Sequence, residues 1–215
     1  MATFVFVHGA GDTGWYWHLT EAELRARGHH TIAPDLPCDN ASASLDDYAA
    51  AVVDVAANQE DLVLVSQSYG SFTATLAASR LPTRLLVLVA GMIPRPGETP
   101  GQWWTETGYQ PAADDDPLIT YCNGVPRPLA EEALRRGGRG ESSVVWDTPW
   151  PLRAWPDVPT RLVVCRDDNF FPADFLRRVA RERLGIVPDE IPGCHCVALS
   201  HPKELGDLLD GYVSN

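Results

Sequence analysis

The segment LVLVSQSYGSF, residues 62–72, passes from an apolar strand-like run to a helical pattern, with only small residues between the two. This pattern predicts a strand that turns sharply into a helix, with Ser68 at the tip of the turn, where its hydroxyl is clear of both elements. Ser66 and Gly70 flank Ser68, and small residues suit these positions because the backbone doubles back tightly there. The motif S-x-S-x-G is moderately specific for a nucleophilic serine on an α/β fold.

Three other predicted strands end in residues that can carry chemistry. The apolar run at 2–7 leads into the glycine-rich loop HGAG, whose amides can approach a ligand closely. The run at 161–165 is followed by Asp167 and Asp168, and a short run near 189–192 is followed by His195. Because the carboxyl ends of parallel strands meet at one edge of the sheet, we expect these groups to lie close together, in the chain order Ser, Asp, His.

Strand and helix patterns alternate along most of the chain. Strands are predicted at 2–7, 30–34, 62–66, 84–89, 161–165 and 189–192, and helices at 15–27, 45–58, 69–80, 172–184 and 202–213. Ser44, three residues before Asp47, marks the start of the second helix. The alternation predicts one α/β domain over residues 1–215, with a mainly parallel sheet of about six strands and helices on both faces.

Four segments together resemble the α/β-hydrolases, in particular the small-cap group that contains plant methylesterases, hydroxynitrile lyases and their bacterial relatives. They are HGAGDTGWYW (8–17), SQSYG (66–70), CRDDNFFP (165–172) and GCHCVALSHP (193–202). The order Ser, Asp, His is that of the α/β-hydrolase triad. The resemblance implies the α/β-hydrolase fold and favours Asp168 over Asp167 as the triad acid, although the residues alone leave both open. It also implies that His8 orders the oxyanion loop.

The insertion at about 92–156 interrupts the alternation and is rich in Pro, Gly and Trp. A structureless loop of that length is uncommon in a compact domain. The resemblance implies instead a small cap over the sheet edge, helical around 128–136, which would exclude water and shape the substrate pocket. Most of its tryptophans are expected to join the cap to the body, and Trp103 and Trp104 are the expected substrate-binding residues.

The predicted chemistry is that of a serine hydrolase. Ser68 needs a base to become a nucleophile, and His195, with an ordinary pKa of about 6.5, suits proton transfer near neutral pH. Asp168 would fix the imidazole tautomer and stabilise the imidazolium. The backbone N–H groups of Ala10 and Tyr69 are the expected oxyanion donors. The predicted function is a carboxylesterase-like enzyme that cleaves a small neutral ester through an acyl-enzyme, without a metal or other cofactor.

Two positions separate the chain from the plant hydroxynitrile lyases that it resembles. Those lyases carry a threonine after the residue corresponding to His8 and a lysine after the catalytic histidine, where this chain has Gly9 and Cys196. Without this lysine, the positive charge that would stabilise departing cyanide is missing, which argues against a cyanide-releasing lyase. Two alternatives stay open: a lyase, cyclase or dehydratase that uses the same site in a biosynthetic pathway, and a noncatalytic small-molecule receptor, which would need no triad.

Charge and cysteine content limit partners and location. A net charge of −12 argues against nucleic acids and anionic membrane surfaces, and no apolar run approaches the roughly 20 residues of a membrane span. The five cysteines are an odd, scattered set, which predicts free thiols and a reducing cytoplasmic location. Cys194 and Cys196 flank His195, but alternate residues of an extended segment point to opposite faces, so zinc is not expected. The expected partner is a small-molecule substrate, and a homodimer is left open.

Overall fold

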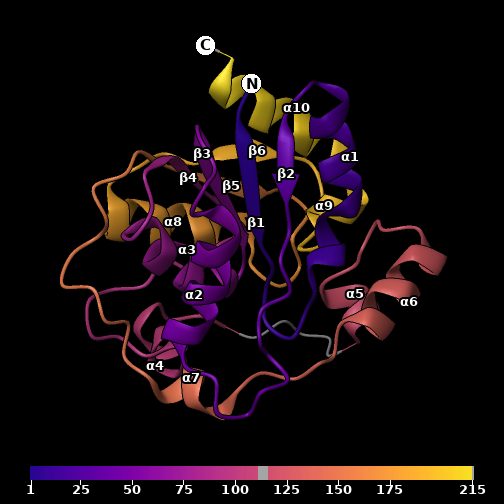
Figure 1. Ribbon diagram of the computed structural model, residues 1–215. Helices are drawn as coiled ribbons and strands as arrows, with labels where there is room; N and C mark the ends of the chain where they lie inside the picture. Colours follow the sequence, from indigo (N-terminus) through magenta and orange to yellow (C-terminus); the bar gives the residue numbers. More distant parts are fainter. Residues whose placement is uncertain (111–115, 215) are drawn as a thin grey trace.

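A parallel β-sheet forms the centre of the molecule (Figure 1). The computed structural model describes residues 1–110 and 116–214, and within them six strands lie in the order β2-β1-β3-β4-β5-β6, every neighbouring pair parallel. The strands are β1 (Thr3–Val7), β2 (His30–Ile32), β3 (Leu62–Gln67), β4 (Thr83–Val89), β5 (Thr160–Cys165) and β6 (Asp189–Ile191). The predicted sheet, its strand direction and its number of strands are confirmed.

The central strands β1 and β3 are buried along their whole length. Helices cover both faces of the sheet, so these strands need apolar side chains on both sides, which explains their continuous apolar runs. β3 lies between β1 and β4, and β1 pairs with it as far as Val7 opposite Ser66. The residues that follow β3 therefore emerge at the middle of the carboxyl edge, directly beside the loop that follows β1.

Five long helices cover the sheet close to their predicted positions. They are α1 (His18–Ala26), α2 (Leu45–Ala56), α3 (Gly70–Ala78), α8 (Ala173–Leu184) and α10 (Pro202–Val213). α1 and α10 pack against each other on one face, and α2 and α3 pack against each other on the other (Figure 1). The predicted start of α2 is confirmed, because the Ser44 side chain accepts from the Asp47 amide while the Asp47 carboxylate accepts from the Ser44 amide.

Two short elements differ from the sequence prediction. The predicted helix at 15–27 begins as a separate 3₁₀ turn, η1 (Gly14–Trp17), in which Tyr16 and Trp17 are buried. A helix that was not predicted, α9 (Val197–Ser200), follows His195. Both elements are four residues long, which is too short for hydrophobic periodicity to identify them.

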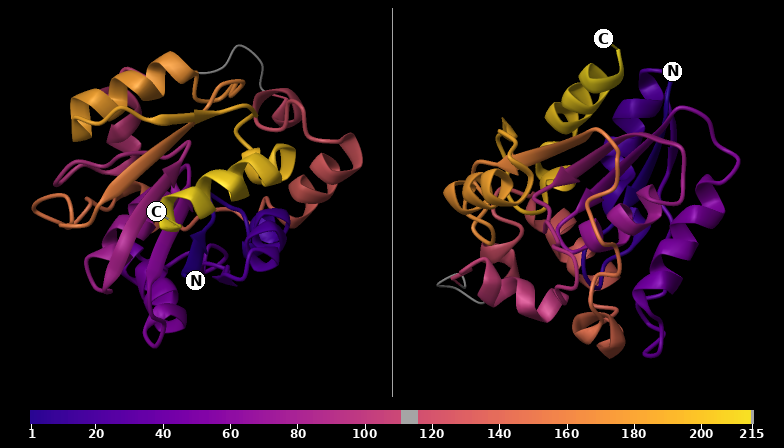
Figure 2. Two further views of the ribbon diagram at one scale, coloured as in Figure 1. Left: turned by 90° about the horizontal axis from the view of Figure 1, so that it is seen from above. Right: turned by 90° about the vertical axis from the view of Figure 1, so that its left-hand side faces the viewer.

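The described residues of the insertion at 92–156 form four helices beyond the carboxyl ends of the strands (Figure 1). They are α4 (Pro100–Glu106), α5 (Pro117–Thr120), α6 (Arg127–Arg136) and α7 (Ser143–Asp147). α6 coincides with the predicted helix around 128–136. Seen with the sheet upright, α4 and α7 lie on one side of this edge and α5 and α6 on the other (Figures 1 and 2).

Buried side chains join the insertion to the body. The Trp150 indole is buried and donates to the Thr75 hydroxyl of α3 at 3.1 Å. Glu98 forms an ion pair with Arg183 of α8, whose Nη2 lies 2.7 Å from Glu98 Oε1, and both side chains are almost fully buried. Among the described residues, no helix is long and apolar enough to cross a membrane.

Candidate active site

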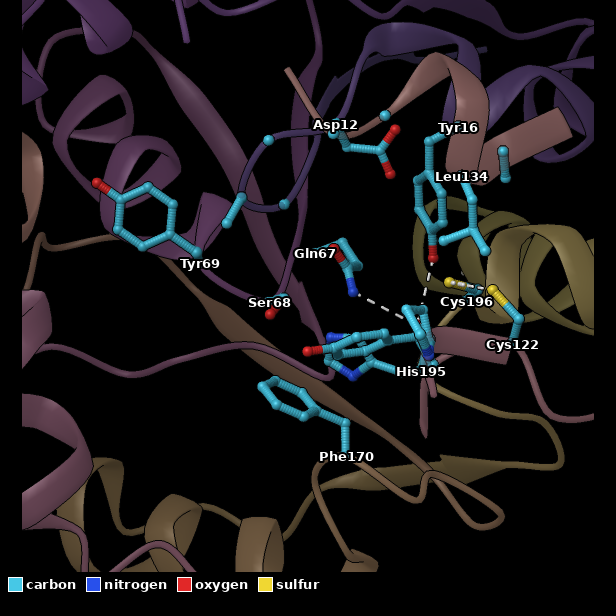
Figure 3. Close-up of a pocket in the computed structure, with 18 of the residues that line it drawn as sticks. Asp12, Tyr16, Gln67, Ser68, Tyr69, Cys122, Leu134, Phe170, His195 and Cys196 are labelled. Carbon is cyan, nitrogen blue, oxygen red and sulfur yellow. Dashed lines mark hydrogen bonds between the residues drawn. The ribbon is translucent and has the colours of Figure 1, made fainter. Parts of the chain in front are cut away.

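Ser68 lies on a strained turn between β3 and α3. Its φ is +52°, a left-handed conformation that few residues other than glycine adopt. The turn is held by the end of β4 and the residues after it, because the Ser68 amide donates to Val89 O at 3.1 Å and the Met92 amide donates to Ser68 O at 3.0 Å. A side chain at Gly70 would place its Cβ 2.3 Å from His8 O, which explains the glycine of the motif. These bonds present Ser68 to the cavity at the sheet edge (Figure 3).

Ser66, which stands where α/β-hydrolases usually carry glycine, is accommodated in the elbow. It is fully buried, and its hydroxyl lies 3.0 Å from the Ser71 hydroxyl of α3. A buried hydroxyl without a partner would destabilise the turn, whereas this pair satisfies both groups. Serine at position 66 therefore links β3 with α3 and does not block the turn.

His195 and Asp168 form a buried hydrogen-bonded pair. His195 Nδ1 lies 2.8 Å from Asp168 Oδ2. The other carboxylate oxygen accepts from the amides of Phe170 and Phe171, both at 2.8 Å. Edge-on contacts with the rings of Phe170 and Phe171 surround the imidazole. Because the carboxylate accepts at Nδ1, it fixes the ring so that Nε2 is the nitrogen left for the cavity.

Asp167 has a different position from its neighbour. Its Oδ2 accepts from the Gly193 amide at 2.8 Å, and its own amide donates to Gly193 O at 3.0 Å. Asp167 thus holds the start of the loop that carries His195, and it is Asp168 that contacts the imidazole. Of the two adjacent carboxylates, Asp168 orients the imidazole ring and Asp167 supports the loop.

The proposed oxyanion donors lie beside Ser68. Ala10 and Tyr69 both line the same cavity. Within residues 1–110 and 116–214, neither of their amides donates a hydrogen bond to another protein group. The Tyr69 ring points away from Ser68 and packs against Trp146, with ring centroids 4.9 Å apart, so only its backbone faces the site (Figure 3). An amide at the start of a helix suits a developing negative charge.

The loop that carries Ala10 is held from both sides. His8 is buried, its Nε2 accepts from the Leu36 amide at 3.0 Å, and burial lowers its pKa to about 4, so it is neutral at neutral pH. These contacts indicate that His8 supports the structure of the loop. From the insertion, Glu141 Oε1 accepts from the Gly11 amide at 2.7 Å while Glu141 Oε2 accepts from the Tyr48 hydroxyl at 2.6 Å. Sequence reasoning missed Glu141 because no local pattern connects it with a loop 130 residues away.

The cavity has a volume of about 450 Å³, and several aromatic residues are part of its wall. Each helix of the insertion provides a side chain near this wall: Trp104 from α4, Tyr121 after α5, Leu134 from α6 and Trp146 from α7. Trp104 thus lines the cavity, as expected. The expectation for Trp103 needs correction, because its side chain is fully buried, donates to Ile93 O at 3.1 Å and does not line the cavity.

The structure shows what surrounds Gly9 and Cys196, the two positions that differ from the plant hydroxynitrile lyases. A Cβ at Gly9 would lie 2.2 Å from Gln67 Oε1, so the Gln67 side chain occupies the space that a threonine would need. Cys196 carries no positive charge, and its Sγ lies 3.6 Å from that of Cys122 in the insertion. All five cysteines are free thiols. Among the described residues, no group of three His, Cys, Asp or Glu could hold a metal ion.

Comparisons with known proteins agree with this architecture. The model of the alpha/beta hydrolase family matches residues 4–208. The probable esterase PIR7A of Oryza sativa subsp. indica is 36% identical over 248 residues, which cover 96% of this chain and 94% of the relative. Norfluorocurarine synthase 1 of a Strychnos species is 23% identical and covers 96% of this chain. The crystal structure of polyneuridine aldehyde esterase superposes over 100% of both chains with a TM-score of 0.84 at 19% identity, a likeness of fold.

Proposed function

This chain belongs to the alpha/beta hydrolase family, and we propose that it cleaves a small carboxylic ester through an acyl-enzyme on Ser68. It is an enzyme of the serine esterase type, as the full-length similarity to an esterase indicates. The observation that carries the finer proposal is the 2.8 Å contact between His195 Nδ1 and Asp168 Oδ2 beside the cavity that Ser68 lines. A buried imidazole held in one tautomer is what general-base catalysis requires.

In the proposed first half-reaction, His195 Nε2 takes the proton of the Ser68 hydroxyl as its oxygen attacks the ester carbonyl. The amides of Ala10 and Tyr69 donate hydrogen bonds to the carbonyl oxygen and stabilise the negative charge that develops on it, and the Asp168 carboxylate stabilises the imidazolium. The imidazolium then gives its proton to the departing alkoxide, which leaves the acyl group on Ser68. Water activated by the same histidine releases the acid in the second half-reaction.

One alternative has support of its own. A relative that matches over nearly the whole chain is named as a synthase, which favours non-hydrolytic chemistry at the same site as the second candidate. The cyanide-releasing variant has less support, because Gln67 fills the space beside Gly9 and Cys196 provides no positive charge. A receptor would not need the oriented His195–Asp168 pair.

The test is a series of p-nitrophenyl esters from acetate to dodecanoate. A cavity of about 450 Å³ should accept acetate to hexanoate and exclude long acyl chains, so kcat/KM should fall beyond hexanoate. Ser68→Ala should abolish turnover, whereas Ser79→Ala, the same change at an exposed position after α3, should not.

A fluorophosphonate probe separates the alternatives. It should label the protein at Ser68 and leave Ser68→Ala unmodified. Labelling without ester turnover would favour the synthase-like alternative. Absence of labelling and turnover, together with tight binding of a small molecule, would favour a receptor. Labelling at Ser66 or Ser71 would contradict the choice of nucleophile.

The cytoplasmic location remains part of the proposal. It is supported by five free thiols, a state that a reducing compartment maintains. Fractionation of the native organism with an antibody against this chain should recover it with the cytoplasmic markers. Recovery with secreted or membrane proteins would contradict the location.

A further inference from the structure

Asp12 is a carboxylate in the wall of the cavity that the proposed mechanism does not use. It lies in the loop after β1, and its Oδ1 accepts from the Thr13 amide at 2.8 Å. In the view of Figure 3, Asp12 and Phe170 lie on opposite sides of the cavity, with Ser68 and His195 between them. Among the described lining residues, Asp12 carries the only carboxyl group, and none is lysine or arginine.

No protein cation pairs with this carboxylate in the described part of the chain. The nearby Arg139 pairs with Asp39 at 2.7 Å and reaches Asp12 only at its backbone oxygen, at 3.4 Å. Arg136 lies over the Trp15 ring instead. Burial raises the Asp12 pKa to about 6; the charge of Asp35 acts in the same direction, whereas the hydrogen bond from the Thr13 amide and the charge of Arg139 lower it. At neutral pH the cavity therefore contains a mostly ionised, partly buried carboxylate that no protein cation contacts directly, and a cationic ligand would supply that contact.

The remaining wall is suited to an organic cation. Aromatic side chains line it, including Trp104, Tyr121 and Phe170. Aromatic faces attract ammonium groups, most strongly where water is excluded, and a carboxylate adds the opposite charge. The net charge of −12 would also raise the local concentration of a cationic substrate. An uncharged ester would use the aromatic wall but not the carboxylate.

We propose that Asp12 binds a protonated or quaternary amine on the substrate, so that the ester cleaved at Ser68 carries an organic cation. This inference rests on the proposed esterase function and replaces the neutral ester expected from the sequence with an amine-bearing one. Ser68 and Asp12 would then hold the two ends of one ligand, the ester group at the elbow and the ammonium group at the loop after β1. Asp12 would act as a specificity-determining residue.

The test compares acetylcholine with 3,3-dimethylbutyl acetate, in which a carbon atom replaces the charged nitrogen in the same shape. Wild type should prefer the cationic ester in kcat/KM by about tenfold or more. A preference of this size corresponds to the energy of a single cation–π contact at an exposed or partly buried site. In Asp12→Asn, which keeps an acceptor for the Thr13 amide, the ratio should fall towards one. Asp35→Asn, which removes a neighbouring charge outside the cavity wall, should keep the wild-type ratio.

Equal loss of both esters in Asp12→Asn would overturn the inference, because Asp12 would then only support the loop. Equal kcat/KM of both esters in wild type would also overturn it and would leave the esterase function intact. Binding to Ser68→Ala, measured by calorimetry, separates the two proposals further. Acetylcholine should bind this variant more tightly than 3,3-dimethylbutyl acetate, and Asp12→Asn should remove the difference, even if no ester were hydrolysed.

Discussion

The sheet edge and the insertion form the same cavity in different ways. Ser68, Asp168 and His195 follow β3, β5 and β6 within four residues, and backbone hydrogen bonds such as Ser68 N to Val89 O hold their loops. The described part of the insertion contributes side chains from its helices and the residues beside them, held by buried anchors such as Trp150. The proposed reacting groups thus depend on strand ends, whereas the part of the wall that the insertion provides depends on side-chain packing. We therefore expect substitutions in the insertion to change the accepted acyl chain more than the reactivity of Ser68.

The largest effect is expected at the sheet edge. In Asp168→Asn, the amide would present an N–H towards His195 Nδ1 and favour the wrong tautomer, so kcat should fall by about 10⁴. Asp167→Asn should have a mild effect, because the asparagine oxygen can still accept from the Gly193 amide. Steady-state kinetics on a p-nitrophenyl ester, with circular dichroism to verify folding, measures both. A larger loss in Asp167→Asn would exchange the roles of the two residues.

The insertion offers a matched pair of adjacent tryptophans. Trp103→Ala removes a fully buried side chain and should lower the free energy of unfolding by about 3–5 kcal/mol. Trp104→Ala removes part of the cavity wall and should raise KM and widen the accepted acyl chain length, with a smaller loss of stability. Urea denaturation and the ester series distinguish the two. If both variants changed only stability, the insertion would not shape the cavity at Trp104.

The loop after β1 contains two groups with opposite pH dependence. The His8 pKa is 6.5 in the unfolded chain and about 4 when folded, so the unfolded state binds more protons in this window. Stability from His8 is therefore complete above pH 6.5 and is lost, by up to about 3 kcal/mol, as pH falls to 4. The Asp12 pKa is raised from 3.8 to about 6, so its contribution is present below 3.8 and is lost as pH rises through 6.

Urea unfolding of two variants at pH 4.5, 5.5 and 7 tests these opposite signs. His8→Gln should lose less stability in acid than wild type, and Asp12→Asn should lose more. His30→Gln, at an exposed position in β2, serves as the control and should follow wild type. A parallel shift of all three curves would show that neither group titrates differently in the folded state.

The smallest effect is expected for the thiols. Cys194 donates to the Ser200 hydroxyl and Cys196 lies 3.6 Å from Cys122, and serine can replace a thiol in both contacts. A Cys194→Ser, Cys196→Ser variant should therefore retain most of its activity, and metal analysis of wild type should find no stoichiometric zinc. Inactivation by chelators would show that the site depends on a metal.

Prediction from sequence succeeded where a local pattern has a local cause. Continuous apolar runs identified β1 and β3 because both faces of these strands are covered. The capping box at Ser44 identified the start of α2, since both of its bonds lie within four residues. The small residues around Ser68 identified the elbow, whose tight turn excludes larger side chains at Gly70.

The sequence by itself determined the parallel sheet, the order of the strand-end residues and the position of the elbow, because each depends on neighbours along the chain. Only the tertiary structure decided that Trp104 faces the cavity while Trp103 does not, that Glu141 holds the loop after β1, and that Gln67 fills the space beside Gly9. The insertion lacks a long periodic pattern, and its side chains are placed by contacts with residues distant in sequence. Which groups face a ligand is therefore fixed only when those distant segments pack together.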